Sequence, residues 1–591
     1  MLSITELPLL ALLFPALATL LCTALGRPWP RRPAFWARWV LRVGLLLGLA
    51  DAIAVLDLLQ PGGTLQTTLW RLDPQLPISL SVDTTGTVIA ILVLVAALIV
   101  SFAARDRRPL ASAALGLAAL GAVGAAFAGD LLGLYIGLQL STLGGIGLSY
   151  ARQPRSASSR MVWAALADQT IGLVWLGAMV LLLNQTATLQ LNAIPTSSVG
   201  PALAGLLLLP AVVRLAGCGL IAGSAVPGRP GSLSRSMDIA DWLAVVAVPT
   251  SLLLLVRIQS LSGGSWPVVW FGTCLDLFGL LLGLVAVLSL LMSSNPHSPL
   301  RSVLLLLGAL VVVGFGQNST DGTLLALMAG LFLEISSAFL PRAALSRPRR
   351  RGAGNPPPSP RHLSWQRLVG NAATLAPCGL GFTVAVLGLD LALRSGLKLG
   401  FTPALAYFLA LAGLVLAVPR LLRDATLPSR WNWALWLPAL CLGAGALLPG
   451  WTVTVAAAAL APPGTAGAAL LSAPDPLVVA APGLLWPGGY LVLLALIGGG
   501  GAWALRLVMG PSGTALPGAS PPDLVPSLEH LPRVTAWLAR WGGRPSWTRG
   551  VRGWYATLAR LADREAAERP VWLWIGAAAV AAYLLAEMVR L

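Results

Sequence analysis

Apolar stretches long enough to cross a lipid bilayer recur along almost the entire chain, and this recurrence restricts the possible folds more than any other feature. A helix needs about 20 consecutive, mostly apolar residues to span a membrane. Of the 591 residues, 57% are hydrophobic and only 10% are charged, a balance that no ordinary water-soluble domain has. The sequence therefore predicts an all-α polytopic membrane protein with about 14–16 transmembrane helices.

The expected spans follow one another closely. The first opens with Glu6 and lacks a basic leading region, so we expect a retained helix and not a cleaved signal. The Ala-rich stretch 450–474 is broken by Pro462 and Pro463, and we interpret it as a loop. The expected spans lie near residues 5–26, 39–60, 84–103, 110–128, 130–150, 161–184, 201–225, 238–258, 267–293, 300–317, 321–341, 367–393, 399–420, 431–449, 477–508 and 571–589.

Basic residues predict the side of the membrane on which each loop lies. The net charge of +17 comes almost wholly from arginine, and the arginines cluster in loops that follow odd-numbered spans. Because cytoplasmic loops carry excess positive charge, odd spans should end inside and both termini should lie outside. Arg394 and Lys398, after the twelfth span, are the exception. The charge suits contact with anionic lipid, and no basic folded domain is available to bind nucleic acid.

Two long segments are not expected to cross the membrane. Residues 342–366 are rich in arginine and proline and should form a flexible inside loop. Residues 509–570 begin as a Pro/Gly/Ser linker and continue as candidate amphipathic helices at 527–541 and 548–569. These helices would lie at the lipid headgroups or dock on a neighbouring subunit.

No motif for soluble catalysis occurs in the sequence. We find no phosphate-binding glycine loop, no dinucleotide fingerprint and no zinc motif, so no cofactor and no metal are expected. The five cysteines lack paired spacing, and we interpret them as small buried packing residues. At most, the chain would be a non-catalytic subunit of a larger enzyme.

Any ion chemistry would therefore use polar groups inside the spans, which are expensive to bury and so are functional candidates. The candidates that we expect to face the protein interior are Gln139, Asp168, Arg214, Asp276 and Glu334. Arg214 needs a partner, and we expect Asp168 or Glu334 to pair with it. Other acids lie near span ends, where they should simply reach water; these are Asp51, Asp57, Asp83, Asp130, Asp241 and Asp390.

Several stretches, in order and at similar spacing, match the spans of one family of membrane proteins. LSVDTTGTVIAILVLVAALIVSF corresponds in this match to a third span, and DLLGLYIGLQLSTLGGIGLSY to a fifth. LLLLPAVVRLAGCGL and VAVPTSLLLLVRI correspond to the seventh and eighth spans, LMSSNPHSPLRSVLLLLGALVVVGFG to the ninth-to-tenth joint, LLALMAGLFLEISSAFL to the eleventh and LAPCGLGFTVAVLGL to the twelfth. These stretches resemble the antiporter-like membrane subunits of respiratory complex I, the large Mrp antiporter subunits, and their relatives in membrane hydrogenases and inorganic-carbon pumps. The resemblance runs from about residue 78 to 422.

The resemblance implies two inverted five-helix repeats, each with a broken helix and a charged residue near the midplane. It divides the chain into N-terminal spans (1–110), a first repeat (111–260), a second repeat (261–341 and 367–423), spans 14–15 (424–508), the linker and amphipathic segment (509–570) and a last span (571–591).

The residues of the family's proton relay are largely replaced here. The fifth-span glutamate falls on Gln139, the seventh-span lysine on Arg214 and the eighth-span lysine on Pro249. Further along, the eleventh-span histidines fall on Ala326 and Gly330, the nearby lysine on Glu334 and the twelfth-span lysine on Ala385. Glutamine cannot titrate and arginine keeps its proton, so a relay through these positions is interrupted.

Three interpretations follow. The chain is a structural or weakly transporting subunit of a complex-I-like assembly. Alternatively, it conducts protons or cations through a rearranged relay, in a quinone oxidoreductase, a hydrogenase or an inorganic-carbon pump. The third is an unrelated transporter or scaffold that matches by apolar composition. In the first two cases, its partners are other membrane subunits and the bilayer.

Overall fold

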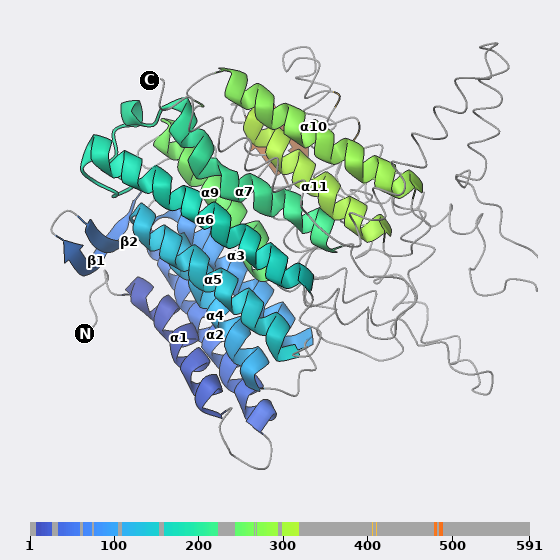
Figure 1. Cartoon of the computed structure of the whole chain (residues 1–591). Coiled ribbons are helices and arrows are strands. Elements are labelled where there is room, and N and C mark those ends of the chain that lie inside the picture. Colours follow the sequence, from blue (N-terminus) through green and yellow to red (C-terminus); the bar gives the residue numbers. More distant parts are fainter. Residues whose placement is uncertain are drawn as a thin grey trace, which may run out of the picture.

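A computed structural model describes residues 7–25, 33–59, 63–73, 76–103, 109–152, 159–222, 243–264, 266, 269–292 and 298–317, together with residues 405 and 409 and the stretches 478–481 and 484–487 (Figure 1). The expected spans beyond residue 317 lie outside the described residues, apart from residues 405 and 409 of the span 399–420 and the start of 477–508.

Long apolar helices dominate the described part of the chain. They are α1 (Leu7–Leu25), α2 (Pro33–Leu58), α3 (Thr84–Ala103), α4 (Pro109–Ala126), α5 (Leu131–Arg152), α6 (Ser159–Thr186), α7 (Pro201–Ala222), α9 (Val248–Leu261), α10 (Val269–Met292) and α11 (Ser298–Gly316), with a 3₁₀ turn η2 (Thr196–Ser198) and a π-helix η3 (Leu243–Ala247). Five of these helices, α2, α3, α4, α5 and α10, contain a continuous stretch long and apolar enough to cross a membrane. The prediction of a helical membrane protein is confirmed, and the first ten expected spans each coincide with a helix or, for 238–258, with η3 and α9.

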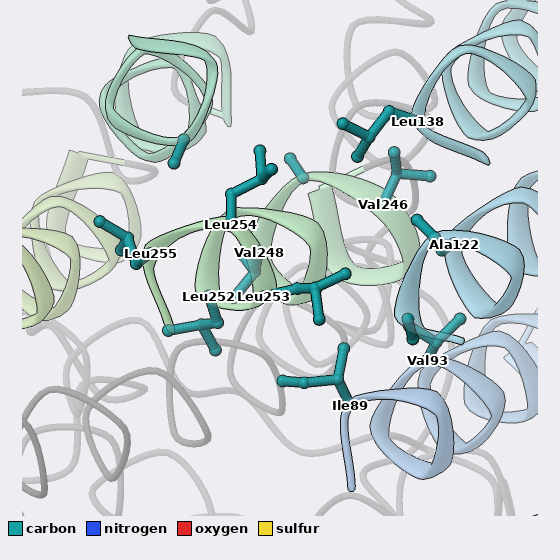
Figure 2. Packing of buried hydrophobic residues seen from close by; sticks show 14 of the residues in the cluster. Ile89, Val93, Ala122, Leu138, Val246, Val248, Leu252, Leu253, Leu254 and Leu255 are labelled. Carbon is teal, nitrogen blue, oxygen red and sulfur yellow. The ribbon is translucent and has the colours of Figure 1, made fainter. Parts of the chain in front are cut away.

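The segment formed by η3 and α9 lies at the centre of the described bundle. Figure 2 shows Val246 and Leu253 of this segment packed among Ile89 of α3, Ala122 of α4 and Leu138 of α5. Residues 245–255 are all buried and mostly apolar. A mostly apolar helical stretch of this kind belongs in the interior of a bundle, which is where the structure places it.

A β-hairpin follows α2, where the sequence predicted only a loop over residues 61–82. Strands β1 (Leu65–Asp73) and β2 (Leu76–Val82) pair antiparallel. Figure 1 shows the hairpin at one end of the helices. The alternation in LQTTLWRLD and LPISLSV is a strand pattern that we missed because the segment is short and lies between two spans.

Backbone hydrogen bonds join this hairpin to two other connections. The Ser81 amide donates to the Phe127 carbonyl (2.9 Å) in the link between α4 and α5, and the Gly129 amide donates to the Ser79 carbonyl (2.9 Å). The Leu191 amide, after α6, donates to the Gly129 carbonyl (3.0 Å). Three connections far apart in sequence therefore form one hydrogen-bonded platform at this end of the bundle.

The beginning of the expected span 477–508 is not helical. Strands β3 (Val478–Ala481) and β4 (Leu484–Pro487) pair antiparallel. Pro482 and Gly483 separate them in the sequence, a dipeptide typical of turns, and a proline cannot continue a helix. A helix beginning at residue 477 was therefore a wrong prediction.

Candidate functional site

A buried arginine connects three helices near the middle of the bundle. Arg214 lies on α7, four residues after Pro210, and only 5% of its surface is exposed. Its Nη1 atom donates to the Thr250 hydroxyl of α9 at 3.0 Å, and Nη2 donates to the Thr142 hydroxyl of α5 at 3.4 Å. The guanidinium is thus held by polar groups that come from two neighbouring helices.

The two threonines can accept from Arg214 because each hydroxyl donates its own proton elsewhere. Thr142 donates to the Leu138 carbonyl (3.1 Å), and Thr250 donates to the Val246 carbonyl in the π-helix. Each of these hydroxyls bonds back to a carbonyl four residues earlier in the chain and turns its lone pairs outward.

Gln139 lies on α5 but is directed to a different neighbour. A methyl group added at Gly172 of α6 would collide with the Nε2 atom of Gln139, so the amide lies against the α6 backbone. One turn earlier, Tyr135 stacks on Trp175 of α6, with the ring centroids 6.4 Å apart. Gln139 therefore contributes to packing between α5 and α6, whereas Thr142 approaches Arg214.

Asp276 is the candidate of the second repeat whose side chain the structure describes. It lies on α10, is 8% exposed, and accepts a hydrogen bond from the Gln317 amide at 2.9 Å. Gly316 on α11 packs against the same carboxylate, where a larger residue would collide with it. Asp276 is buried between α10 and α11 beside a neutral amide.

The expected carboxylate partner of Arg214 stays a prediction. Asp168 lies on α6, but its side chain falls outside the described residues. Glu334 falls outside them as well.

Asp83 does not simply reach water, contrary to our expectation. Its two carboxylate oxygens accept from Arg257 of α9 at 2.5 and 2.8 Å, and the side chains of Asp83 and Arg257 are only 10% and 13% exposed. Asp83 also accepts from the Gly86 amide (2.7 Å), which caps the first turn of α3. Asp83 points inward because its carboxylate caps the start of α3 and also binds Arg257.

Asp130 was also wrongly assigned to solvent, since only 1% of it is exposed. It caps α5 through the Gly133 amide at 2.6 Å. Its second oxygen accepts from the Ser79 amide (2.7 Å) and the Ser79 hydroxyl (3.2 Å) of β2. The hairpin, which we did not predict, is the element that covers it.

Of the remaining acids that we expected to reach water, one is exposed and one is partly buried in the structure. Asp57 is exposed, whereas Asp51 is partly buried and its Oδ2 atom has no partner among the described residues. Asp241 and Asp390 fall outside them. One expected packing cysteine also differs, because Cys274 is exposed on α10 while Cys22 is buried as predicted. Within the described residues, no cluster of three His, Cys, Asp or Glu side chains would hold a metal ion.

Among the residues that contact Arg214 and the candidate acids through polar groups, we did not predict Ser79, Thr142, Thr250, Arg257 and Gln317. For Arg257 a signal existed, because it follows four leucines and a valine inside an expected span. The hydroxyl residues gave no such signal, since threonine and serine are common in membrane helices.

These helices, with the π-helix η3 leading into α9, form a polytopic membrane fold with buried polar contacts between the helices. Solved structures share it. The chain is similar to one in the Mrp complex from Dietzia sp. (TM-score 0.61, 18% identity), covering 95% of this chain and 62% of that one. It is also similar to a chain of respiratory complex I from Thermus thermophilus, with a TM-score of 0.52 and 19% identity, covering 75% of this chain and 98% of that one. A third similar chain belongs to the membrane-bound sulfane sulfur reductase, an archaeal respiratory membrane complex; the TM-score is 0.61 and the identity 14%, and the match covers 78% of this chain and 98% of that one.

The antiporter-like fold is therefore confirmed, whereas the two inverted repeats that the resemblance implied stay a prediction. This chain spans less than two thirds of the Mrp chain that it matches. No family model matches the sequence, and no curated protein matches it.

Proposed function

We propose that this chain is a membrane subunit of a complex-I-like or Mrp-type assembly in which the proton relay of the first repeat is replaced by fixed polar contacts. Its role is then structural, with transport lost or weakened. The observation that carries the proposal is the Arg214 guanidinium, buried and hydrogen-bonded to hydroxyls of α5 and α9.

A proton relay needs groups that bind and release a proton near the working pH. Arginine does not lose its proton in a protein, and the hydroxyls of Thr142 and Thr250 do not ionise in this range. Gln139 carries no charge, and its amide lies against α6. A permanent positive charge held in the centre of the bundle also repels protons and cations that would pass it.

The alternative is a working proton- or cation-conducting subunit with a rearranged relay built on Asp168, Arg214, Asp276 and Glu334, such as that of an inorganic-carbon pump or a hydrogenase. Asp276 is the observation that favours it. A carboxyl group that is buried beside a neutral amide, with no arginine or lysine among its described hydrogen bonds, is able to change protonation.

Proton flux in proteoliposomes separates the two functions. The purified assembly with Asp276→Asn is compared with the unmodified assembly under an imposed pH gradient, and Asp57→Asn serves as the control because Asp57 is exposed. A structural subunit gives the same flux in all three preparations. A fall in flux with Asp276→Asn alone would transfer the proposal to the conducting alternative.

The proposal extends to the partners of this chain. We expect other membrane subunits to contact this chain in a bacterial inner, plasma or thylakoid-type membrane, with both termini outside. The chain is tagged, extracted in mild detergent and analysed by mass spectrometry. Co-purifying quinone-site and iron–sulfur subunits would support a redox-driven membrane arm, and a soluble zinc-type partner would indicate a carbon pump. A chain that purifies alone would contradict the subunit proposal.

A further inference from the structure

The first turns of α2 carry a cluster of aromatic and basic side chains that the proposed function does not use. Phe35, Trp36 and Trp39 are 45%, 57% and 46% exposed. Phe35 packs edge-on against both tryptophans, so the rings form one surface. Tryptophan prefers the level of the lipid headgroups, where the apolar ring and the polar N–H are both accommodated. This aromatic surface therefore marks a membrane interface.

Arg42 lies beside this aromatic surface, between α2 and the end of α3. Its guanidinium carbon is 4.4 Å from the centroid of the Phe102 ring and 5.6 Å from that of Trp39. Its Nη2 atom donates to the Ser101 carbonyl at 2.9 Å, in the last turn of α3, where carbonyls lack partners within the helix. The planar group is thus oriented by two rings and one hydrogen bond.

Not all N–H groups of the Arg42 guanidinium are used in hydrogen bonds to the described residues. Arginine has five N–H donors, and the structure gives Arg42 a hydrogen bond to Ser101 only among the described residues. Its Nε atom is covered and has no partner in that same part of the chain. Arg38 lies one turn earlier on α2, so a second positive charge lies near that of Arg42.

We propose that Arg42 and Arg38 bind the phosphate of an anionic phospholipid, with Trp36 and Trp39 at the level of its headgroup. Paired N–H groups of a guanidinium match two phosphate oxygens. The sequence adds positive charge nearby, since Arg31 and Arg32 immediately precede α2 and Arg105 follows the last residue of α3 by two positions. Asp106 is the one acid in those flanks.

The surface beyond the arginines determines that the phosphate belongs to a lipid. Along α2, Val43, Leu46, Leu47 and Ile53 are 45–52% exposed, which provides an apolar strip for acyl chains below the headgroup. A free phosphate ion would leave this strip uncovered. Both helix ends lie on the side that the arginine distribution assigns to the inside, where anionic lipids attract basic residues.

Native mass spectrometry of the full chain in mild detergent tests the proposal. Dioleoylphosphatidylglycerol is titrated against dioleoylphosphatidylcholine, and the bound lipid is counted. We expect preferential retention of the anionic lipid, reduced about tenfold by Arg42→Gln, because one charge-assisted contact is lost. Glutamine still has an amide that can donate to the Ser101 carbonyl, so the helix ends should stay joined. Arg42→Lys, which keeps the charge and loses the fork, should give an intermediate value.

Arg301→Gln is the matched control, because it removes the same charge from the start of another helix on the predicted inside. It should leave lipid retention unchanged, and Arg38→Gln should reduce it. Unchanged retention in Arg42→Gln and Arg38→Gln would overturn the proposal. Displacement of the lipid by inorganic phosphate at equal concentration would also overturn the proposal. The same holds if the substitutions release a bound protein and leave the bound lipid unchanged. Equal thermal midpoints of all variants would exclude unfolding as the cause.

Discussion

At the scale of single residues, Asp83 and Arg257 make the strongest side-chain contact between distant parts of the described chain. The ion pair joins the start of α3 to the last turns of α9 through two hydrogen bonds. Removing one partner from a largely buried pair leaves the other charge without compensation, which typically costs about 3–5 kcal/mol.

We therefore predict that Arg257→Gln lowers the stability of the chain by about 3 kcal/mol. The measurement is the thermal unfolding midpoint in detergent, followed by tryptophan fluorescence. Asp83→Asn should be destabilising as well, although its Oδ1 atom can still cap Gly86. The double variant should lose less than the sum of the single ones, since both remove the same contact. Additive losses would show that the pair is not coupled.

By the sequence resemblance, Gln139 falls on the fifth-span glutamate of the antiporter-like subunits, and in the structure it packs against α6. Gln139→Glu would restore one titratable group. It would not restore a proton relay, because Arg214 and Pro249, which do not titrate, would remain in it. We predict that Gln139→Glu produces no proton flux in proteoliposomes. Flux created by that single change, measured with a pH-sensitive dye, would contradict the structural role proposed above.

At the scale of secondary-structure elements, the hairpin and the connections after α4 and α6 depend on close backbone approach at Gly129. A Cβ there would lie 2.7 Å from the Ser79 hydroxyl and 2.9 Å from Ser81 Cβ, and both atoms belong to β2. We predict that Gly129→Ala separates the hairpin from the link and destabilises the chain by about 1–3 kcal/mol. Faster amide hydrogen exchange at Ser81 and Leu191 would report that separation.

Gly124 provides the matched control for this substitution. A Cβ at Gly124 would meet only one atom within 4 Å, the Leu12 methyl at 3.9 Å. Gly124→Ala on α4 should leave exchange at the hairpin unchanged and should cost little stability. If both substitutions have equal effects, steric crowding at the platform is not the reason for Gly129.

At the scale of the whole molecule, the distribution of arginine predicts the orientation of the chain in the membrane. The hairpin should lie outside, and the basic loop 342–366 should lie inside. In a variant without natural cysteines, Gln66→Cys should react with an impermeant maleimide added to intact cells. Ser346→Cys should react only after permeabilisation. The reverse labelling pattern would show that the chain has the opposite orientation in the membrane. The proposed lipid site would then lie in the other leaflet.

Local features of the sequence were enough to predict the class of the protein and the order of its first ten spans. Uninterrupted apolar length, proline placement and arginine distribution are local properties, and a bilayer allows few ways to satisfy a backbone at that depth. The first ten expected spans therefore correspond to helical segments in the structure. The resemblance also indicated the antiporter-like fold, which the solved structures share.

Side-chain partners were decided only by the tertiary structure. Nothing local to Asp83 shows that Arg257, 174 positions away, will approach it, or that Ser79 will cover Asp130. The same holds for Arg214, to which the structure brings the hydroxyls of Thr142 and Thr250, two contacts that the sequence did not indicate, while its expected carboxylate partner stays a prediction. Sequence pattern fixes which residues must avoid lipid, because burial of a polar group is costly wherever it happens. Which partner forms a hydrogen bond or an ion pair with each buried polar residue depends on how helices distant in sequence pack together.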